Sequence, residues 1–171
     1  LNIFHEEKGL NISLRNITVS TCGLTEKIMR FADDMPQVNL AVSLHAPSDE
    51  IRLKLMPVAK SCSMSELLSV CRKYTEKTHR RITFEYALIE GVNDSMENAA
   101  QLAARLRGML CHVNLIPLNR VSEKDFRGSA RKHAEKFAAV LSSKGIEVTV
   151  RRELGSDISA ACGQLRLTAE S

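Results

Sequence analysis

Segments with the two-residue period of β-strands alternate with segments of the 3.6-residue helical period along this chain. Strand-like segments are expected at residues 16–20, 38–45, 82–89, 112–117 and 146–151. Helix-like segments are expected at residues 25–34, from about 48, at 63–77, from a cap at residues 93–95 to about 108, and at 130–144. Strands joined through helices by short connections favour right-handed βαβ units and a parallel sheet. The sequence therefore predicts an α/β fold in a single domain.

Composition limits the class of protein further. The 171 residues are 44% apolar, which is enough for one hydrophobic core. The longest apolar runs are far shorter than the roughly 20 residues that span a bilayer, so we expect no membrane segment. The given sequence does not open on a pattern that resembles a signal peptide, and its five cysteines are an odd number, so we expect thiols in a reducing cytoplasm. The first residue is Leu1 rather than methionine, so we expect a piece of a longer protein.

Polar residues gather where the predicted strands end. The strand ends carry Ser20-Thr21-Cys22-Gly23, Ser43-Leu44-His45, Glu85 followed by Glu90, and Pro117-Leu118-Asn119. Polar residues are ordinary caps and turn formers, so any single one of these groups carries little information. Ligands of α/β proteins bind at the carboxyl ends of the strands, and four polar ends together predict a shared site there.

Several common functional motifs are missing from the sequence. It contains no Gly-x-x-x-x-Gly-Lys and no Gly-x-Gly-x-x-Gly, which argues against a P-loop and a dinucleotide site. No two cysteines form a Cys-x-x-Cys pair, so no zinc ribbon or local iron–sulfur motif can be built. Cys71 falls on an apolar helix face and is expected in the core. Cys162 differs, because Ala160, Ala161 and Gly163 leave its thiol uncovered; the residues alone fit an incidental thiol as well as a functional one.

Five motifs together resemble one known family. They are Ser20-Thr21-Cys22-Gly23, Ser43-Leu44-His45-Ala46-Pro47, Gly91-Val92-Asn93-Asp94, Asn114-Leu115-Ile116-Pro117-Leu118-Asn119, and Gly155-Ser156-Asp157-Ile158 with Ala160-Ala161-Cys162-Gly163-Gln164-Leu165. In this order and at these intervals, they resemble the RlmN family of radical S-adenosylmethionine (SAM) enzymes, which methylate carbon 2 of an adenine in 23S rRNA and in certain tRNAs. The resemblance extends from about Asn11 to Leu165, and its last motif is highly specific.

The resemblance implies a partial (β/α) barrel of the radical SAM type, with residues 1–171 forming the C-terminal part of that barrel domain. It also implies two cofactors, S-adenosyl-L-methionine and a 4Fe-4S cluster. The family's cluster loop, Cys-x-x-x-Cys-x-x-Cys, is absent from this sequence, as is the Gly-Met-Gly-Glu-Pro-like segment that helps to bind SAM. The chain alone is therefore expected to be inactive.

The family's site residues carry over to matching positions. The resemblance implies that Ser20, the run Ser43, Leu44 and His45, and Asn119 contact SAM. It assigns Cys162 as the cysteine that accepts a methyl group from one SAM molecule. A radical made from a second SAM then activates that methyl group for addition to the adenine. Adenine carbon 2 is not nucleophilic, so a simple polar methyl transfer would not suffice.

RNA binding has weaker support from the residues themselves. Candidate phosphate contacts are Arg80-Arg81, Lys124, Arg127, Arg131-Lys132-Lys136 and Arg151-Arg152. Each also fits a solvated helix or strand end, and with two Tyr, five Phe and no Trp a stacking platform is not evident. We expect 23S rRNA and tRNA as partners and no obligate protein partner. Two alternatives stay open: a related methyltransferase acting at adenine carbon 8 and conferring antibiotic resistance, and a non-catalytic RNA-binding remnant of the barrel.

Overall fold

The computed structural model describes residues 3, 6, 9–117 and 129–151 of the chain. The strands are β1 (Thr18–Thr21), β2 (Asn39–Ser43), β3 (Ile82–Leu88), β4 (Cys111–Pro117) and β5 (Glu147–Val150). The α-helices are α2 (Thr25–Asp34), α3 (Asp49–Leu55), α4 (Met64–Thr78), α5 (Met96–Leu106) and α6 (Arg131–Ser143), and the short 3-10 helices are η1 (Leu14–Asn16) and η2 (Pro57–Lys60). The predicted alternation of strands and helices is confirmed.

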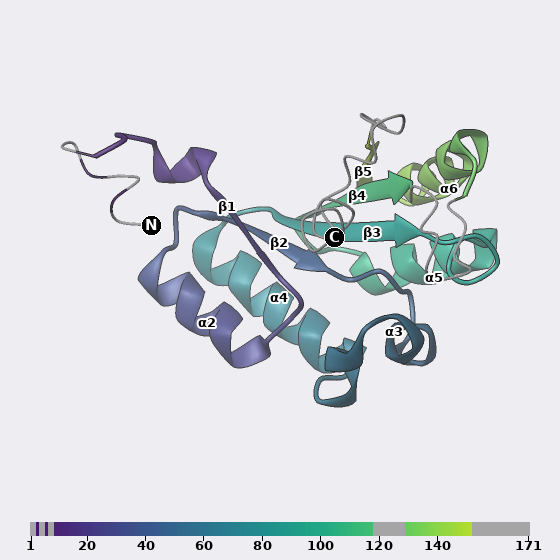
Figure 1. The fold of residues 1–171 in the computed structure, drawn as a ribbon, viewed down its shortest axis with the longest axis horizontal. Helices are drawn as coiled ribbons and strands as arrows, with labels where there is room; N and C mark the ends of the chain where they lie inside the picture. The colour runs from purple at the N-terminus through teal and green to yellow at the C-terminus, as the bar shows by residue number, and fades with distance from the viewer. Residues whose placement is uncertain (1–2, 4–5, 7–8, 118–128, 152–171) are drawn as a thin grey trace, which may run out of the picture.

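The strands form one parallel sheet in the order β1-β2-β3-β4-β5, the same as their order in the chain. Each connection therefore advances by one strand in the same direction. Since such crossovers are right-handed, the helices all fall on one face of the sheet. Figure 1 shows α2 and α4 side by side next to β1 and β2, and α5 and α6 pack together farther along the sheet. This is the arrangement of a (β/α) barrel wall.

The two faces of the sheet differ in burial. Along β3 and β4, every second residue is buried and the residues between are half-buried. The buried set faces the helices, where the Tyr86 ring on β3 packs on Phe137 of α6 with ring centroids 5.4 Å apart. Cys71 on α4 is fully buried in the same core, as predicted. The other face carries the polar residues Thr83, Glu85, His112 and Asn114, and it is the face that the described helices leave uncovered.

Three helices, α3, α4 and α5, begin directly after a serine that caps them. The Ser63 hydroxyl accepts the Glu66 N–H and the Glu66 carboxylate accepts the Ser63 N–H, a capping box that begins α4. Ser95 and Asn98 make the same reciprocal pair at the start of α5. Ser48 caps α3 through the Ile51 N–H. The expected beginnings of these helices are confirmed.

Two strand boundaries differ from expectation by two residues, and the other differences are of one residue. β1 begins at Thr18 rather than residue 16, because residues 14–16 form the 3-10 turn η1. β2 ends at Ser43 rather than His45, because His45 adopts a left-handed backbone with φ of 55°. In the described parts of the chain, no helix is both long and apolar enough to cross a membrane. The described cysteines, Cys22, Cys62, Cys71 and Cys111, are all free thiols.

Candidate ligand site on the open face of the sheet

The strand register brings the predicted polar residues into two rows on the open face. The first row crosses the sheet through Ser20, Ala41, Thr83, His112 and Glu147. The second row, one pleat nearer the carboxyl ends, crosses it through Ser43, Glu85, Asn114 and Thr149. Ser20 is exposed and Ser43 is half-buried. The structure therefore places these two hydroxyls on the same face of adjacent strands, as the shared-site hypothesis requires.

Hydrogen bonds order the side chains of these rows into one directed chain. Asn114 Nδ2 donates to Glu85 Oε2 at 3.0 Å. Thr149 Oγ1 donates to Asn114 Oδ1 at 3.3 Å and lies 3.1 Å from His112 Nε2. Because the Thr149 hydroxyl donates to Asn114, His112 Nε2 is assigned as the donor to Thr149. The donors thus point in sequence toward the Glu85 carboxylate, which leaves an ordered polar surface suited to a polar ligand.

The Ser43-Leu44-His45 run leaves the sheet at its carboxyl edge. The Leu44 side chain is fully buried in the core and its N–H donates to Glu85 O at 3.0 Å, so contact of Leu44 with a ligand would involve its backbone. His45 Nδ1 accepts the Ala87 N–H at 3.0 Å. Burial, and secondarily the charge of Arg52, lowers the pKa of His45 to about 4. At neutral pH the imidazole is therefore uncharged, with its proton on Nε2.

The neutral His45 makes stability depend on pH. The unfolded chain takes up a proton at the usual pKa near 6.5, whereas folded His45 takes it up only near 4. The contribution of neutral His45 to the free energy of unfolding is therefore complete above pH 6.5. It decreases by up to about 3 kcal/mol as the pH falls toward 4. We expect His45→Asn, which keeps a short acceptor suited to a left-handed backbone, to remove this dependence in denaturant unfolding measured from pH 7.5 to 4.

His79→Asn is the matched control for this prediction. His79 has nearly the same left-handed φ, 52°, but its side chain is exposed at the end of α4. That variant should retain the wild-type loss of stability toward pH 4. Equal pH slopes in wild type and His45→Asn would contradict the assignment of the dependence to His45.

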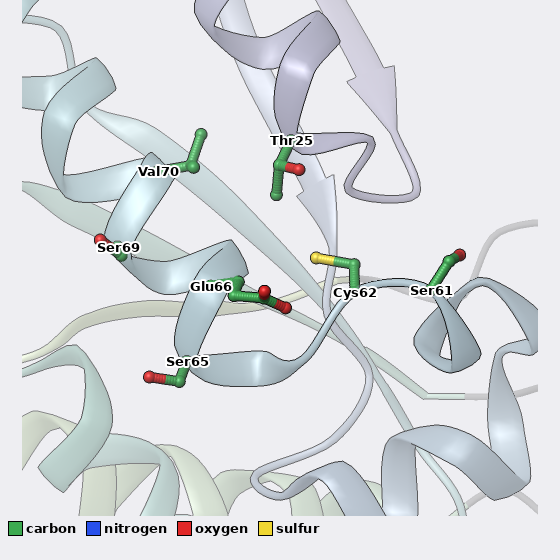
Figure 2. A pocket seen from close by; sticks show the side chains of 7 residues that line it. All are labelled: Thr25, Ser61, Cys62, Ser65, Glu66, Ser69 and Val70. Atoms are coloured by element: carbon green, nitrogen blue, oxygen red, sulfur yellow. The ribbon is translucent and has the colours of Figure 1, made fainter.

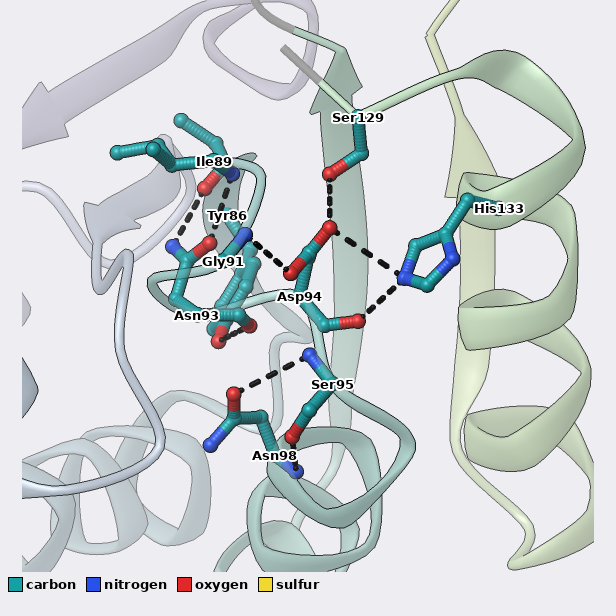
Figure 3. Close-up of polar contacts among 10 residues, drawn as sticks. Tyr86, Ile89, Gly91, Asn93, Asp94, Ser95, Asn98, Ser129 and His133 are labelled. Carbon is teal, nitrogen blue, oxygen red and sulfur yellow. Dashed lines mark hydrogen bonds and ion pairs between the residues drawn. The ribbon is translucent and has the colours of Figure 1, made fainter. Parts of the chain in front are cut away.

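A buried asparagine fixes the position of the His45 turn through hydrogen bonds. Asn93 is fully buried, and its Nδ2 donates to His45 O and to Ala87 O, both at 2.7 Å. Its Oδ1 accepts the Ile89 N–H at 2.7 Å, and its backbone oxygen accepts the Tyr86 hydroxyl at 2.7 Å (Figure 3). Asn93 therefore ties the end of β2 to the end of β3. The sequence suggested Asn93 only as a family motif residue and as part of a helix cap. The structure shows that Ser95 caps α5, and the role of Asn93 in joining the two strand ends was missed.

The neighbouring Asp94 joins the same loop to α6. Its carboxylate accepts the Gly91 N–H at 3.0 Å and the Ser129 hydroxyl at 2.6 Å. His133 Nε2 lies 2.6 Å from Asp94 O and 3.4 Å from Oδ2. Since both of these atoms are acceptors, His133 is the donor. Figure 3 shows Ser129 and His133 both directed at Asp94. The cluster fixes the start of α6 against the loop after β3; because Ser129 and His133 share the carboxylate, they do not form a nucleophile–base pair.

A cavity in the helix layer contains none of the predicted site residues. About 440 Å³ in volume, it lies between the start of α2 and the start of α4 (Figure 2), and it is lined by Thr25, Ser61, Cys62, Ser65, Glu66, Ser69 and Val70. Burial raises the pKa of the Cys62 thiol, which keeps it protonated and a poor nucleophile. A second cavity of about 430 Å³ lies at the amino ends of the strands, lined by Thr18, Asn39, His79, Arg80, Arg81 and Thr83. Neither cavity coincides with the strand-end site.

The remaining predicted residues fall elsewhere. Glu90 is exposed in the turn after β3. Asn119 and Cys162 lie outside the described residues, so their assignments stay predictions. Within the described ranges, no group of three or more His, Cys, Asp or Glu side chains could hold a metal ion. The sequence reasoning also missed Arg52, a fully buried arginine behind the strand ends; a lone arginine in a short charged helix gives no signal of burial.

Comparisons with known proteins identify the chain's relatives. No family model matches it. It is similar to proteins named probable dual-specificity RNA methyltransferase RlmN: 57% identical over 166 residues to that of Clostridium perfringens strain SM101, 54% to that of Thermoanaerobacter sp. strain X514, and 52% to that of Clostridium tetani. Each alignment covers 97% of this chain and 48% of the relative. The chain thus spans about half the length of these relatives.

Solved structures agree with the sequence comparison. The crystal structure of a radical SAM methyltransferase from Sphaerobacter thermophilus matches with a TM-score of 0.91 and 52% identity, over 95% of this chain and 48% of that one. A domain of pyruvate-formate lyase-activating enzyme from Bacteroides vulgatus matches with a TM-score of 0.62 at 16% identity, which shows the fold alone. The expected partial barrel of the radical SAM type is confirmed. The chain belongs to the RlmN family of dual-specificity RNA methyltransferases.

Proposed function

We propose that this chain forms one part of the barrel domain of an enzyme that methylates carbon 2 of an adenine in 23S rRNA and tRNA by radical SAM chemistry. The observation that carries the proposal is the identity of 52–57% over 97% of the chain to proteins named dual-specificity RNA methyltransferase. The names of these relatives do not state which adenine carbon or which RNAs are methylated. The motif resemblance supports carbon 2, 23S rRNA and tRNA.

The open face of the sheet suits S-adenosylmethionine. Ser20 and Ser43 offer hydroxyls that can donate to or accept from the ribose and the methionyl amine and carboxylate. The neutral His45 offers an Nε2 donor without a competing positive charge near the cationic sulfonium. Asn119 and the backbone of Leu44 complete the proposed contacts.

The 4Fe-4S cluster needs ligands from beyond the described residues, among which no candidate group of ligands occurs. When bound, the cluster supplies the electron that starts the radical chemistry. This chain contributes the polar face on which the cofactor is held and oriented.

Cys162 is the proposed methyl carrier. Its thiolate forms a carbon–sulfur bond to the SAM methyl group as the sulfonium–methyl bond breaks, and S-adenosylhomocysteine leaves. The described buried thiols are poor substitutes, because burial raises the pKa of Cys71 to about 12 and that of Cys111 to about 11. Both therefore stay protonated near pH 7 and unreactive.

The proposal is tested by peptide mass spectrometry of the full-length protein, purified anaerobically with its iron and supplied with SAM. We expect the Cys162 peptide to be heavier than its sequence mass by one CH2 group. An unmodified Cys162 in cluster-loaded protein would refute the carrier role and favour the RNA-binding remnant. Nuclease digestion of methylated RNA then assigns the product, since 2-methyladenosine and 8-methyladenosine separate chromatographically, and the second product would favour the carbon 8 alternative.

We place this activity in the cytoplasm, where ribosomal and transfer RNA are found. The free state of the described cysteines supports a reducing compartment. Among the candidate phosphate contacts, Arg81 and Arg131 are paired with Glu147 and Glu135. These pairs are exposed, so their arginines can exchange a carboxylate for an RNA phosphate at small cost.

A further inference from the structure

We propose that Arg52 is a positioning residue that holds the turn after β1, next to Ser20, in the arrangement that binds S-adenosylmethionine. The inference rests on the proposed function, because it concerns the same strand-end site. Nothing in the motif resemblance assigns a role to Arg52.

Arg52 joins three segments that are distant in the sequence. It lies on α3 and its side chain is fully buried. Nη2 donates to Cys22 O at 2.9 Å, in the turn after β1. Nη1 donates to Cys62 O at 3.3 Å, in the loop that leads into α4 and lines the cavity of Figure 2. One guanidinium therefore fixes the position of the β1 turn relative to α3 and α4.

Burying this cation is costly for the fold. Within the described residues its Nε has no hydrogen-bond partner, and no carboxylate forms an ion pair with it. The nearby Asp49 carboxylate accepts the Met64 N–H at 2.5 Å instead. Buried charges without a counter-ion cost several kcal/mol, and apolar replacements are often neutral or stabilising. The burial of Arg52 is thus unfavourable for stability, whereas its two hydrogen bonds define a particular geometry.

Within the described residues, the turn that Arg52 holds has few other hydrogen bonds. Its internal hydrogen bond runs from the Gly23 N–H to Thr21 Oγ1 at 3.2 Å. Gly23 has a φ of +100°, and a Cβ there would lie 3.1 Å from Arg52 Nη2 and 3.0 Å from Leu67 Cδ1. The guanidinium thus packs directly on the turn, two or three residues after Ser20.

The same guanidinium acts on the other half of the site. Its charge is the second cause, after burial, of the lowered pKa of His45. Arg52 thus fixes the turn after β1 by a hydrogen bond, and its charge also acts on the His45 imidazole. A lysine cannot replace it, because a single ammonium on a flexible stem does not reproduce two donors held in a planar fork.

Arg72→Lys is a matched control for Arg52→Lys. On α4, Arg72 donates through Nη1 to Arg107 O at 3.2 Å and through Nη2 to Arg105 O at 2.7 Å. It likewise joins two backbone carbonyls in another segment, at the end of α5 rather than at the strand ends. Both variants lose two bonds to backbone carbonyls, although Arg52 is fully buried and Arg72 is half-buried, so the control measures the loss of such bonds away from the strand ends.

The experiment uses the full-length, cluster-loaded enzyme and measures the SAM dissociation constant by calorimetry, with amide hydrogen exchange of residues 20–24. We expect Arg52→Lys to raise the dissociation constant about tenfold or more and to speed exchange in that turn. Arg72→Lys should leave both within about twofold of wild type. Equal affinities in the two variants, or weaker binding without faster exchange of the turn, would overturn the positioning role. Wild-type enzyme that fails to bind SAM would instead refute the proposed function, and this inference with it.

A second pair of variants covers the case in which Arg52→Lys does not fold. Gly23→Ala leaves the arginine in place and places a methyl group 3.0 Å from Leu67 Cδ1 and 3.1 Å from Arg52 Nη2, so the turn must shift relative to the guanidinium. Gly108→Ala has a similar left-handed φ of +73° and nothing within 4 Å of its added Cβ. We expect only Gly23→Ala to weaken SAM binding about tenfold, and equal binding by the two alanine variants would overturn the proposal.

Discussion

Replacing Cys162 by serine is expected to lower methylation of RNA by at least about a thousandfold, because losing a covalent nucleophile typically costs that much or more. Serine has nearly the same size, but its hydroxyl is not ionised near pH 7 and does not displace the sulfonium of SAM. The measurement is transfer of labelled methyl from SAM to substrate RNA by the full-length, cluster-loaded enzyme, with SAM affinity measured in parallel. Affinity should stay close to that of wild type.

Cys22→Ser is the control for this variant. Cys22 lies in the turn after β1, and its side chain is exposed in the described structure. Only its backbone oxygen bonds Arg52, and the substitution preserves that atom. Its methyl transfer should stay within about twofold of wild type. Substantial methylation by Cys162→Ser, or an equal loss in the two variants, would contradict a specific carrier role for Cys162.

Much of the fold could be predicted because its signals are local. β3 alternates buried and half-buried residues from Ile82 to Leu88, and this alternation is visible in the sequence as a period of two. Ser63 and Ser95 cap helices through residues three positions ahead, so their function depends on a short window. Since parallel strands end at one edge, the grouping of Ser20 and Ser43 followed from the strand assignments alone.

The features that the sequence did not predict depend on contacts between distant segments. β2 continues as an apolar pattern up to His45, and its earlier end accompanies the bond from Asn93, 48 residues away, to the His45 oxygen. The buried Arg52 side chain donates to backbone carbonyls 30 and 10 residues away in the sequence. In both cases one polar side chain bonds backbone groups of other segments, and the periodicity of apolar residues in the sequence does not indicate such bonds. Family resemblance, rather than physical pattern, supplied the assignments of Asn119 and Cys162.

Asn93→Asp is expected to lower the free energy of unfolding by about 4 kcal/mol, although the two side chains have nearly the same shape. Asn93 is fully buried, and its Nδ2 donates to the His45 and Ala87 oxygens. The introduced carboxylate cannot donate, so both oxygens lose a partner and face a buried negative charge. Only the Oδ1 bond from the Ile89 N–H is retained. Denaturant unfolding at pH 7 measures the loss.

Asn98→Asp, five residues later, separates this effect from the chemistry of the substitution itself. Asn98 is at the third position of α5, where its Oδ1 accepts the Ser95 N–H. A carboxylate accepts the same bond, and negative charge in the first turn of a helix is favourable, so the change should be neutral or stabilise by a few tenths of a kcal/mol, roughly. A loss below about 1 kcal/mol in Asn93→Asp would show that the three bonds of that amide are not the tie between β2 and β3. A loss near 4 kcal/mol, with Asn98→Asp unchanged, identifies the Asn93 amide as the group that ties the segment after β2, at His45, to the end of β3.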